Sequence, residues 1–128
     1  MLGVVFKHKG SFDKTTTFLM HASEDKHVLR ILKKYGERGV ILLAQATPKD
    51  TGATANSWEY EILTTNEGYK LTFNNTNYAS NGTPIVVLLQ YGHGKRNGGY
   101  VKGIDFINPV LKPLFEKLST DLWNEVNS

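Results

Sequence analysis

Glycine limits the local structure most strongly between Gln90 and Pro109, where five of the twenty residues are glycine. Each glycine inside a helix costs about 1 kcal/mol relative to alanine, so a helix cannot hold this segment. The same segment carries three cationic side chains and three aromatic rings, which a plain turn does not need. Exposed loops on a rigid scaffold are where proteins often carry their function. We therefore interpret the segment as a long, shaped loop that contacts a partner.

The composition is that of one globular domain. Forty per cent of the 128 residues are apolar, and a chain of this length buries roughly two thirds of its unfolded surface. No apolar run approaches the roughly 18 residues of a membrane span, and the first residues show no secretory signal. Cysteine is absent, which excludes disulfide bonds and fits folding in a reducing cytoplasm. We expect a single domain over residues 1–128 and no membrane segment.

A long helix is predicted after Ser23, which is a suitable N-cap residue. Pro48 ends it, because the residue before a proline avoids helical angles. Gly36 and Gly39 inside the helix are costly, so we expect a close packing partner or a bend there. One face carries the apolar residues at helical spacing: Val28, Leu32, Tyr35, Gly39, Leu42, Leu43 and Ala46.

Two adjacent runs of period-two alternation predict an antiparallel hairpin around Trp58–Ile62 and Tyr69–Phe73, with the aromatic residues turned inward. Gly3–Phe6 could form a short strand, and Thr15–Leu19 could form another strand or an extended arm. No linker or internal repeat is visible. We expect residues 1–22 to form an extended arm of the single domain.

The segment Ile85–Leu89 is compatible with a strand or a short helix. We favour a helix, with Thr83 as N-cap, Pro84 at the first helical position and Gly92 after the end. An amphipathic helix closes the chain and starts near Asn108-Pro109 or Lys112-Pro113. The predicted class is α+β: a long N-terminal helix and a C-terminal helix packed on an antiparallel sheet.

Catalytic and metal-binding patterns are weak. His93 and Asp105 could together provide the general base of a small hydrolase, but no nucleophile accompanies them. The four histidines are scattered without metal-ligand spacing, and Asp50 lies in a turn that lacks the alternating carboxylates of a calcium loop. Arg96 stands where a phosphate-binding loop needs a hydroxyl. We expect no enzyme activity, no cofactor and no metal.

The basic residues of the glycine-rich segment allow two kinds of binding. Lys95, Arg96 and Lys102 could follow a phosphate backbone while Tyr91 and Tyr100 stack on bases. Arginine and tyrosine are also frequent anchors of protein interfaces. We favour protein docking, because the cationic group is small and the net charge is only +3.

Several motifs occur in an order that resembles a phage protein family. They are the turn Thr47-Pro48-Lys49-Asp50-Thr51-Gly52, the strand start Ser57-Trp58, the pair Tyr78-Ala79, the loop Tyr91-Gly92-His93-Gly94 and the helix start Ile107-Asn108-Pro109. The chain resembles, over roughly residues 23 to 126, the minor tail component family of tailed double-stranded DNA phages, also described as tail-completion or head–tail joining proteins.

The resemblance implies a virion structural protein that completes the tail or joins it to the head. It implies a homo-oligomeric ring at the neck, expected to be a hexamer, assembled in the host cytoplasm. The implied partners are head-closure or connector proteins and tail terminator or tail tube proteins, with passive contact to translocating DNA. The alternative is a small nucleic-acid-binding module using the basic loop. The expected interface residues are Pro48, Asp50, Thr51, Gly52, Tyr91, Gly92, His93, Gly94, Lys95, Arg96, Tyr100 and Lys102.

Overall fold

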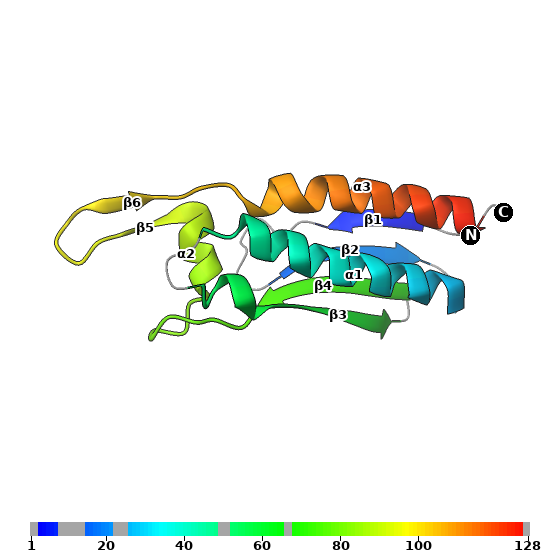
Figure 1. Cartoon of the computed structure of the whole chain (residues 1–128), viewed down its shortest axis with the longest axis horizontal. Helices are drawn as coiled ribbons and strands as arrows, with labels where there is room; N and C mark the ends of the chain where they lie inside the picture. Colours follow the sequence, from blue (N-terminus) through cyan, green and yellow to red (C-terminus); the bar gives the residue numbers. More distant parts are fainter. Residues whose placement is uncertain (1–2, 8–14, 22–25, 49–51, 66–67, 127–128) are drawn as a thin grey trace.

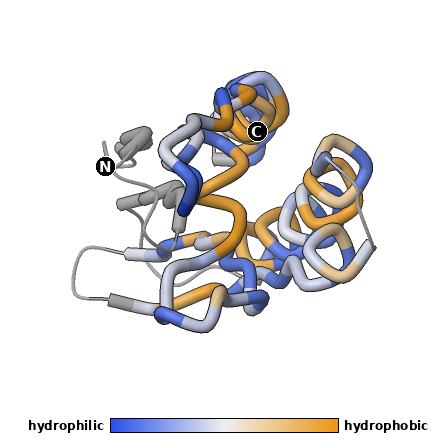
Figure 2. Tube along the Cα trace, turned by 90° about the vertical axis from the view of Figure 1, so that its left-hand side faces the viewer, coloured by the Kyte–Doolittle hydropathy of each residue, from blue (hydrophilic) through white to orange (hydrophobic). Residues whose placement is uncertain are grey.

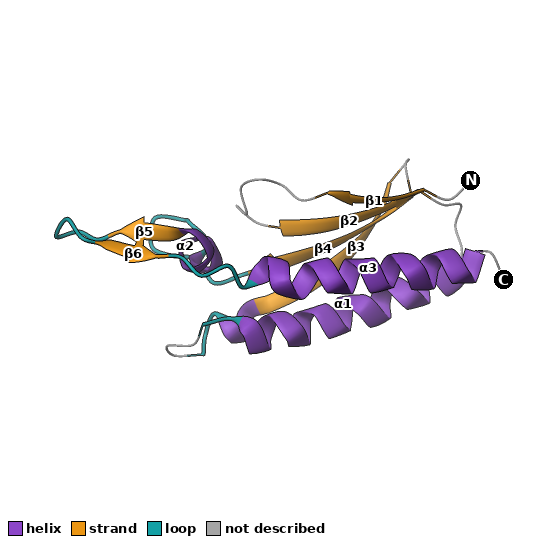
Figure 3. Ribbon diagram, turned by 90° about the horizontal axis from the view of Figure 1, so that it is seen from above, coloured by secondary structure: helices purple, strands orange, loops and turns teal. Residues whose placement is uncertain are grey.

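The protein forms a two-layer α+β domain, as the sequence predicts (Figures 1 and 3). The computed structural model describes residues 3–7, 15–21, 26–48, 52–65 and 68–126. One layer is a four-stranded antiparallel sheet of β1 (Gly3–Lys7), β2 (Thr15–His21), β3 (Trp58–Thr65) and β4 (Gly68–Asn75), in the order β1-β2-β4-β3. The other consists of the long helices α1 (Lys26–Ala46) and α3 (Ile107–Val126), which lie side by side on one face of the sheet. Figure 2 shows these two helices nearly end-on beside the sheet.

Helix α1 confirms the predicted helix and its end before Pro48. The proposed N-cap Ser23 lies outside the described residues. Gly36 and Gly39 face the sheet at very short range: a Cβ atom would lie 2.4 Å from Cδ2 of Tyr60 at Gly36 and 2.3 Å from Cζ of Phe73 at Gly39. The predicted close packing partner is therefore confirmed for both glycines, and the missing side chains let the helix approach the aromatic rings.

The strands β3 (Trp58–Thr65) and β4 (Gly68–Asn75) form the predicted hairpin. Tyr69, Leu71 and Phe73 of β4 are buried in the core, and the alternating residues of β3 pack partly against it. Ser57 ends a short 3₁₀ helix, η1 (Ala55–Ser57), directly before β3. The period-two pattern thus predicts both the strands and the face that they bury.

The N-terminal segment differs from the extended arm expected over residues 1–22. Its described part forms β1 (Gly3–Lys7) and β2 (Thr15–His21), which pair with each other. Strand β2 also pairs with β4, so both strands belong to the sheet. The physical reason is that β4 would otherwise leave one edge of backbone groups without partners, and β2 satisfies them.

Helix α2 (Ile85–Tyr91) confirms the helical alternative for this segment. Pro84 is its N-cap rather than its first helical residue, so the helix starts one position later than the sequence indicates. Gly92 ends it with φ of +83°, a conformation that side chains rarely adopt. The sharp change of direction at Gly92 leads the chain out of the domain.

Helix α3 carries the apolar face predicted for the last helix. It begins at Ile107, so Pro109 lies in the first turn and Pro113 lies inside the helix. Leu114 and Phe115 are buried, and the ring of Phe115 lies 6.2 Å from that of Phe73, centroid to centroid. This face closes the core between the two helices and the sheet, together with the buried residues Leu111, Leu118 and Leu122.

Candidate functional site

The glycine-rich segment forms a two-stranded antiparallel hairpin, where the sequence indicates only a shaped loop. Strands β5 (Gly92–Gly94) and β6 (Tyr100–Lys102) pair over three residues each. The turn is closed by hydrogen bonds from the Lys95 amide to the Gly99 carbonyl, at 2.6 Å, and from the Gly98 amide to the Lys95 carbonyl, at 3.1 Å. This projecting hairpin, residues 92–102, extends beyond the end of the sheet and helices (Figures 1 and 3).

The base of the projecting hairpin is packed backbone against backbone. A Cβ atom at Gly92 would lie 2.4 Å from the carbonyl oxygen of Val101, and one at Gly103 would lie 2.4 Å from the carbonyl carbon of Tyr91. The Ile104 amide donates a hydrogen bond to the carbonyl oxygen of Leu89 in α2, at 2.9 Å. These contacts fix the direction in which the hairpin leaves the domain.

Gln90 connects this base to the start of α3. Its side chain is buried, and its Oε1 accepts hydrogen bonds from the amides of Phe106, at 3.1 Å, and Ile107, at 3.2 Å. Its Nε2 donates to Oδ1 of Asp105, at 2.6 Å, and that oxygen also accepts from the side chain of Asn108, at 3.1 Å. Amides at a helix start lack partners within the helix, so Gln90 supplies an acceptor where one is needed.

The projecting hairpin and its base expose apolar and aromatic surface. Tyr100 is 64% exposed and Ile104 is 60% exposed, and Tyr91 and Val101 are also on the surface. Four of the eight large hydrophobic residues that are exposed in the described part of the chain therefore lie between positions 91 and 104. An isolated two-stranded hairpin is at best marginally stable in water. A partner that covers this surface would therefore stabilise the hairpin.

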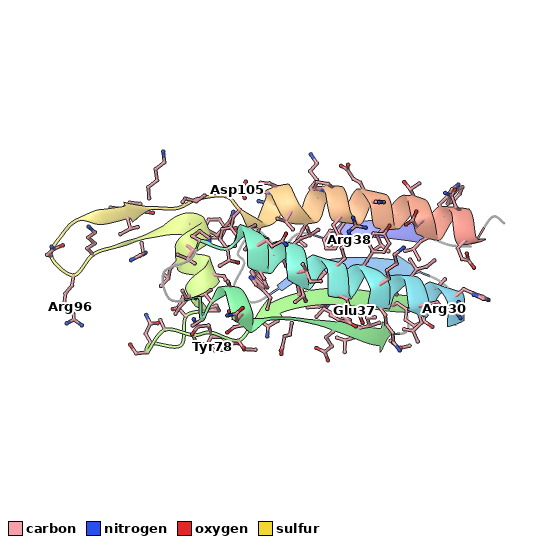
Figure 4. All side chains as sticks on the ribbon, in the orientation of Figure 1. Arg30, Glu37, Arg38, Tyr78, Arg96 and Asp105 are labelled. Carbon is pink, nitrogen blue, oxygen red and sulfur yellow. The ribbon has the colours of Figure 1, made fainter. Side chains whose placement is uncertain are left out.

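Cationic side chains accompany this surface. Lys95, Arg96 and Lys102 are exposed, and Arg96 points outward from the tip of the hairpin (Figure 4). None of the three has an ion pair with another residue that the structure describes. The hairpin therefore offers positive charge and aromatic rings on one small, projecting element.

Two of the predicted turn residues, Pro48 and Gly52, lie at the same end of the domain as the hairpin base. Asp50 and Thr51 fall outside the described residues, while Pro48 and Gly52 flank a pocket of about 230 Å³. Leu89, whose carbonyl holds the hairpin base, lines the same pocket. The described residues that line the pocket are Pro48, Gly52, Thr54, Ala55, Asn77, Ile85 and Leu89.

The sequence interpretation missed the two asparagines that bind Thr54, two residues after the predicted turn. Asn75 is only 1% exposed and donates from Nδ2 to the carbonyl oxygen of Thr54, at 2.8 Å. Asn77 donates from Nδ2 to Oγ1 of Thr54, also at 2.8 Å, and its amide donates to Oδ1 of Asn75. The Asn-Asn-Thr-Asn run at the end of β4 was the available signal, since asparagine side chains commonly bond to nearby turn backbone.

The candidate catalytic residues are not linked to each other by a hydrogen bond. Asp105 is engaged by Gln90 and Asn108, whereas Nδ1 of His93 is buried and has no hydrogen-bond partner among the described residues. The described residues contain no group of three or more histidine, cysteine or acidic side chains that could hold a metal ion. No helix in the described ranges is long and apolar enough to cross a membrane.

Comparison with known proteins finds no match to any family model. No curated protein and no solved structure is similar enough to match this chain.

Proposed function

We propose that this chain is a virion structural protein that completes a phage tail or joins the tail to the head, as a ring of identical copies at the neck. The expected partners are head-closure or connector proteins on one side and tail terminator or tail tube proteins on the other. No enzymatic step and no cofactor belong to this role.

The projecting hairpin is the observation that carries the proposal. It combines a rigid base, held by Gln90 and by the contact between Gly92 and Gly103, with an outer part that exposes Tyr100 and Arg96. The domain that carries the hairpin does not cover this exposed surface. In a larger assembly, a neighbouring protein would cover it. The order of motifs that resembles the minor tail component family provides the second support.

Electron microscopy of lysates from a phage that lacks this gene tests the proposal. The expected result is filled heads that accumulate apart from tails, and infectious particles that return when the gene is supplied from a plasmid. Normal, infectious virions in the absence of the gene would refute the neck role. Antibody labelling of intact virions checks the location independently of the mutant.

A nucleic-acid-binding module is the second candidate function. It is favoured by Lys95, Arg96 and Lys102, which make no ion pair with another described residue and share one hairpin with the exposed ring of Tyr100. It predicts binding to duplex or single-stranded DNA that weakens steeply as the salt concentration rises, because released counterions drive such binding. Absence of any gel retardation at low salt would exclude this candidate.

A further inference from the structure

The outer edge of the sheet offers a surface that complements the projecting hairpin. Strand β3 is the last strand in the order β1-β2-β4-β3, and all eight of its residues pair with β4 on one side only. Its other edge has no strand beside it in the described part of the chain. An open edge of this length presents unpaired amides and carbonyls that readily accept another strand.

The side chains of β3 give this edge a negative charge. Glu59 and Glu61 are exposed and lie on the face turned away from the helices, with the exposed Leu63 on the same face. In the strand register, Glu59 lies opposite Asn74 and Glu61 opposite Thr72, so neither carboxylate faces a cation directly. Neither has an ion pair with another described residue.

The projecting hairpin supplies matching chemistry. Its strand β6 is exposed along its whole length, and its outer edge has no partner strand among the described elements. Alternation places Tyr100 and Lys102 on one face of β6, the same spacing that separates Glu59 from Glu61 on β3. Oppositely charged residues that face each other across paired strands stabilise the pairing.

The hairpin cannot make this contact within its own copy. Its base is fixed by Gln90 and by the close approach of Gly92 and Gly103, and it leads beyond the end of the sheet (Figures 1 and 3). A contact between the hairpin of one copy and β3 of the next uses two different surfaces. Such a head-to-tail interface, repeated by rotation, closes into a ring.

We propose that β6 of one copy adds to the open edge of β3 in the neighbouring copy, with Lys102 facing Glu61 and with Lys95 and Arg96 of the turn adding positive charge beside this negative edge. This inference rests on the proposed ring and names the contact that forms it. The paired segment is short, so each contact is weak and closure of the ring holds the copies together.

Two charge-reversed variants of the purified protein test the contact. Variant E59K/E61K has a positive edge and a positive hairpin, and variant K95E/R96E/K102E has a negative edge and a negative hairpin. Each alone is expected to stay monomeric in light scattering at concentrations where the unchanged protein assembles. An equal mixture is expected to assemble again, because every hairpin then meets an edge of opposite charge. The double variant E37K/E116K, at exposed positions of α1 and α3, is the control for E59K/E61K because it changes the net charge by the same amount.

Cross-linking provides a second readout that does not depend on charge. The chain has no cysteine, so Glu61→Cys combined with Lys102→Cys introduces the only thiols. Oxidation is expected to give a ladder of linked copies from the double variant, whereas each single variant gives at most a linked dimer.

The outcomes separate this contact from the neck role. The contact would be overturned if the unchanged protein remained monomeric at its highest soluble concentration. It would also be overturned if the protein assembled, the E59K/E61K variant assembled equally well, and oxidation of the cysteine pair linked no copies. Both results concern the contact alone. Normal virions from a phage lacking the gene would overturn the neck role and leave the purified assembly unaffected.

Discussion

The side chain of Gln90 donates a hydrogen bond of 2.6 Å to Asp105, fifteen residues later in the chain. The two residues enclose the projecting hairpin, so this bond closes the hairpin at its base. The carbonyl oxygen of the same side-chain amide accepts hydrogen bonds from the backbone amides of Phe106 and Ile107, where α3 begins. One buried side chain thus fixes the hairpin and the last helix relative to each other.

Replacing Gln90 by leucine is expected to lower the free energy of unfolding by about 2 kcal/mol, because the amides of Phe106 and Ile107 lose their buried acceptor. Urea denaturation measures the change. Gln45→Leu is the matched control, since Gln45 is exposed on α1 and its replacement should change stability by less than about 0.5 kcal/mol. Equal effects of the two substitutions would contradict the role of Gln90.

Gly103 at the base of the projecting hairpin and Gly94 within it differ in how much space a side chain would find. A Cβ at Gly103 would meet backbone atoms of Gln90 and Tyr91 at 2.5 and 2.4 Å, whereas a Cβ at Gly94 meets nothing within 4 Å. Gly103→Ala is therefore expected to open the hairpin base and to speed hydrogen exchange of the Ile104 amide at least tenfold. Gly94→Ala should leave that exchange rate unchanged. Slow exchange in Gly103→Ala would show that the backbone tolerates the methyl group.

Gly39→Ala is expected to destabilise the protein although alanine favours a helix by about 1 kcal/mol. The added methyl group would overlap the ring of Phe73, and overpacking of this kind typically costs about 1–3 kcal/mol. Thermal and urea unfolding measure the difference, with Glu37→Ala on the exposed side of α1 as the control. The double variant Gly39→Ala/Phe73→Leu should recover part of the loss, and a more stable Gly39→Ala protein would disprove the contact.

The hydroxyl of Tyr35 donates a hydrogen bond to Asp121 and links α1 to α3. Burial, followed by the hydrogen bond to Asp121 and its charge, raises the pKa of Tyr35 from 10.0 to about 12, against a smaller lowering by Arg38. The folded state therefore keeps its proton longer than the unfolded chain does. The resulting stabilisation is complete below pH 10 and is lost as the pH rises through about 12.

Tyr35→Phe should remove this pH dependence. The unchanged protein is expected to lose roughly 2–3 kcal/mol more stability between pH 9 and pH 12 than the variant does. Urea denaturation at a series of pH values measures the difference, and comparison with the variant cancels the other tyrosines and the lysines. Parallel stability curves for the two proteins would contradict the raised pKa.

Arg96→Ala and Tyr100→Ala are expected to leave the fold intact, because both side chains are exposed on the hairpin. Their unfolding midpoints should match that of the unchanged protein, whereas truncation of the buried Leu118 to alanine should cost about 2–5 kcal/mol. Complementation of a phage lacking the gene should fail or weaken with the hairpin variants. A loss of stability as large as that of Leu118→Ala would make the hairpin a structural element instead.

Periodicity alone was sufficient to predict most of the fold. The apolar spacing from Val28 to Ala46 predicts α1 and its buried face, and the alternation around Trp58 and Tyr69 predicts β3 and β4. Both signals arise because one face of each element is buried, which leaves a direct record in the sequence. The glycines at positions 36 and 39 likewise predict a close contact, although not the ring that makes it.

Tertiary structure alone decided the relations between distant segments. Nothing local indicates that Thr15–His21 pairs with β4, because a strand of a sheet and an extended arm have similar sequences. The hairpin within the glycine-rich segment depends on its base, where Gln90 reaches across to α3. The sequence by itself therefore determined the long helices α1 and α3 and the strands β3 and β4 with their buried faces, which depend on neighbours along the chain. Their partners were decided by contacts between residues far apart in the chain, which no local pattern encodes.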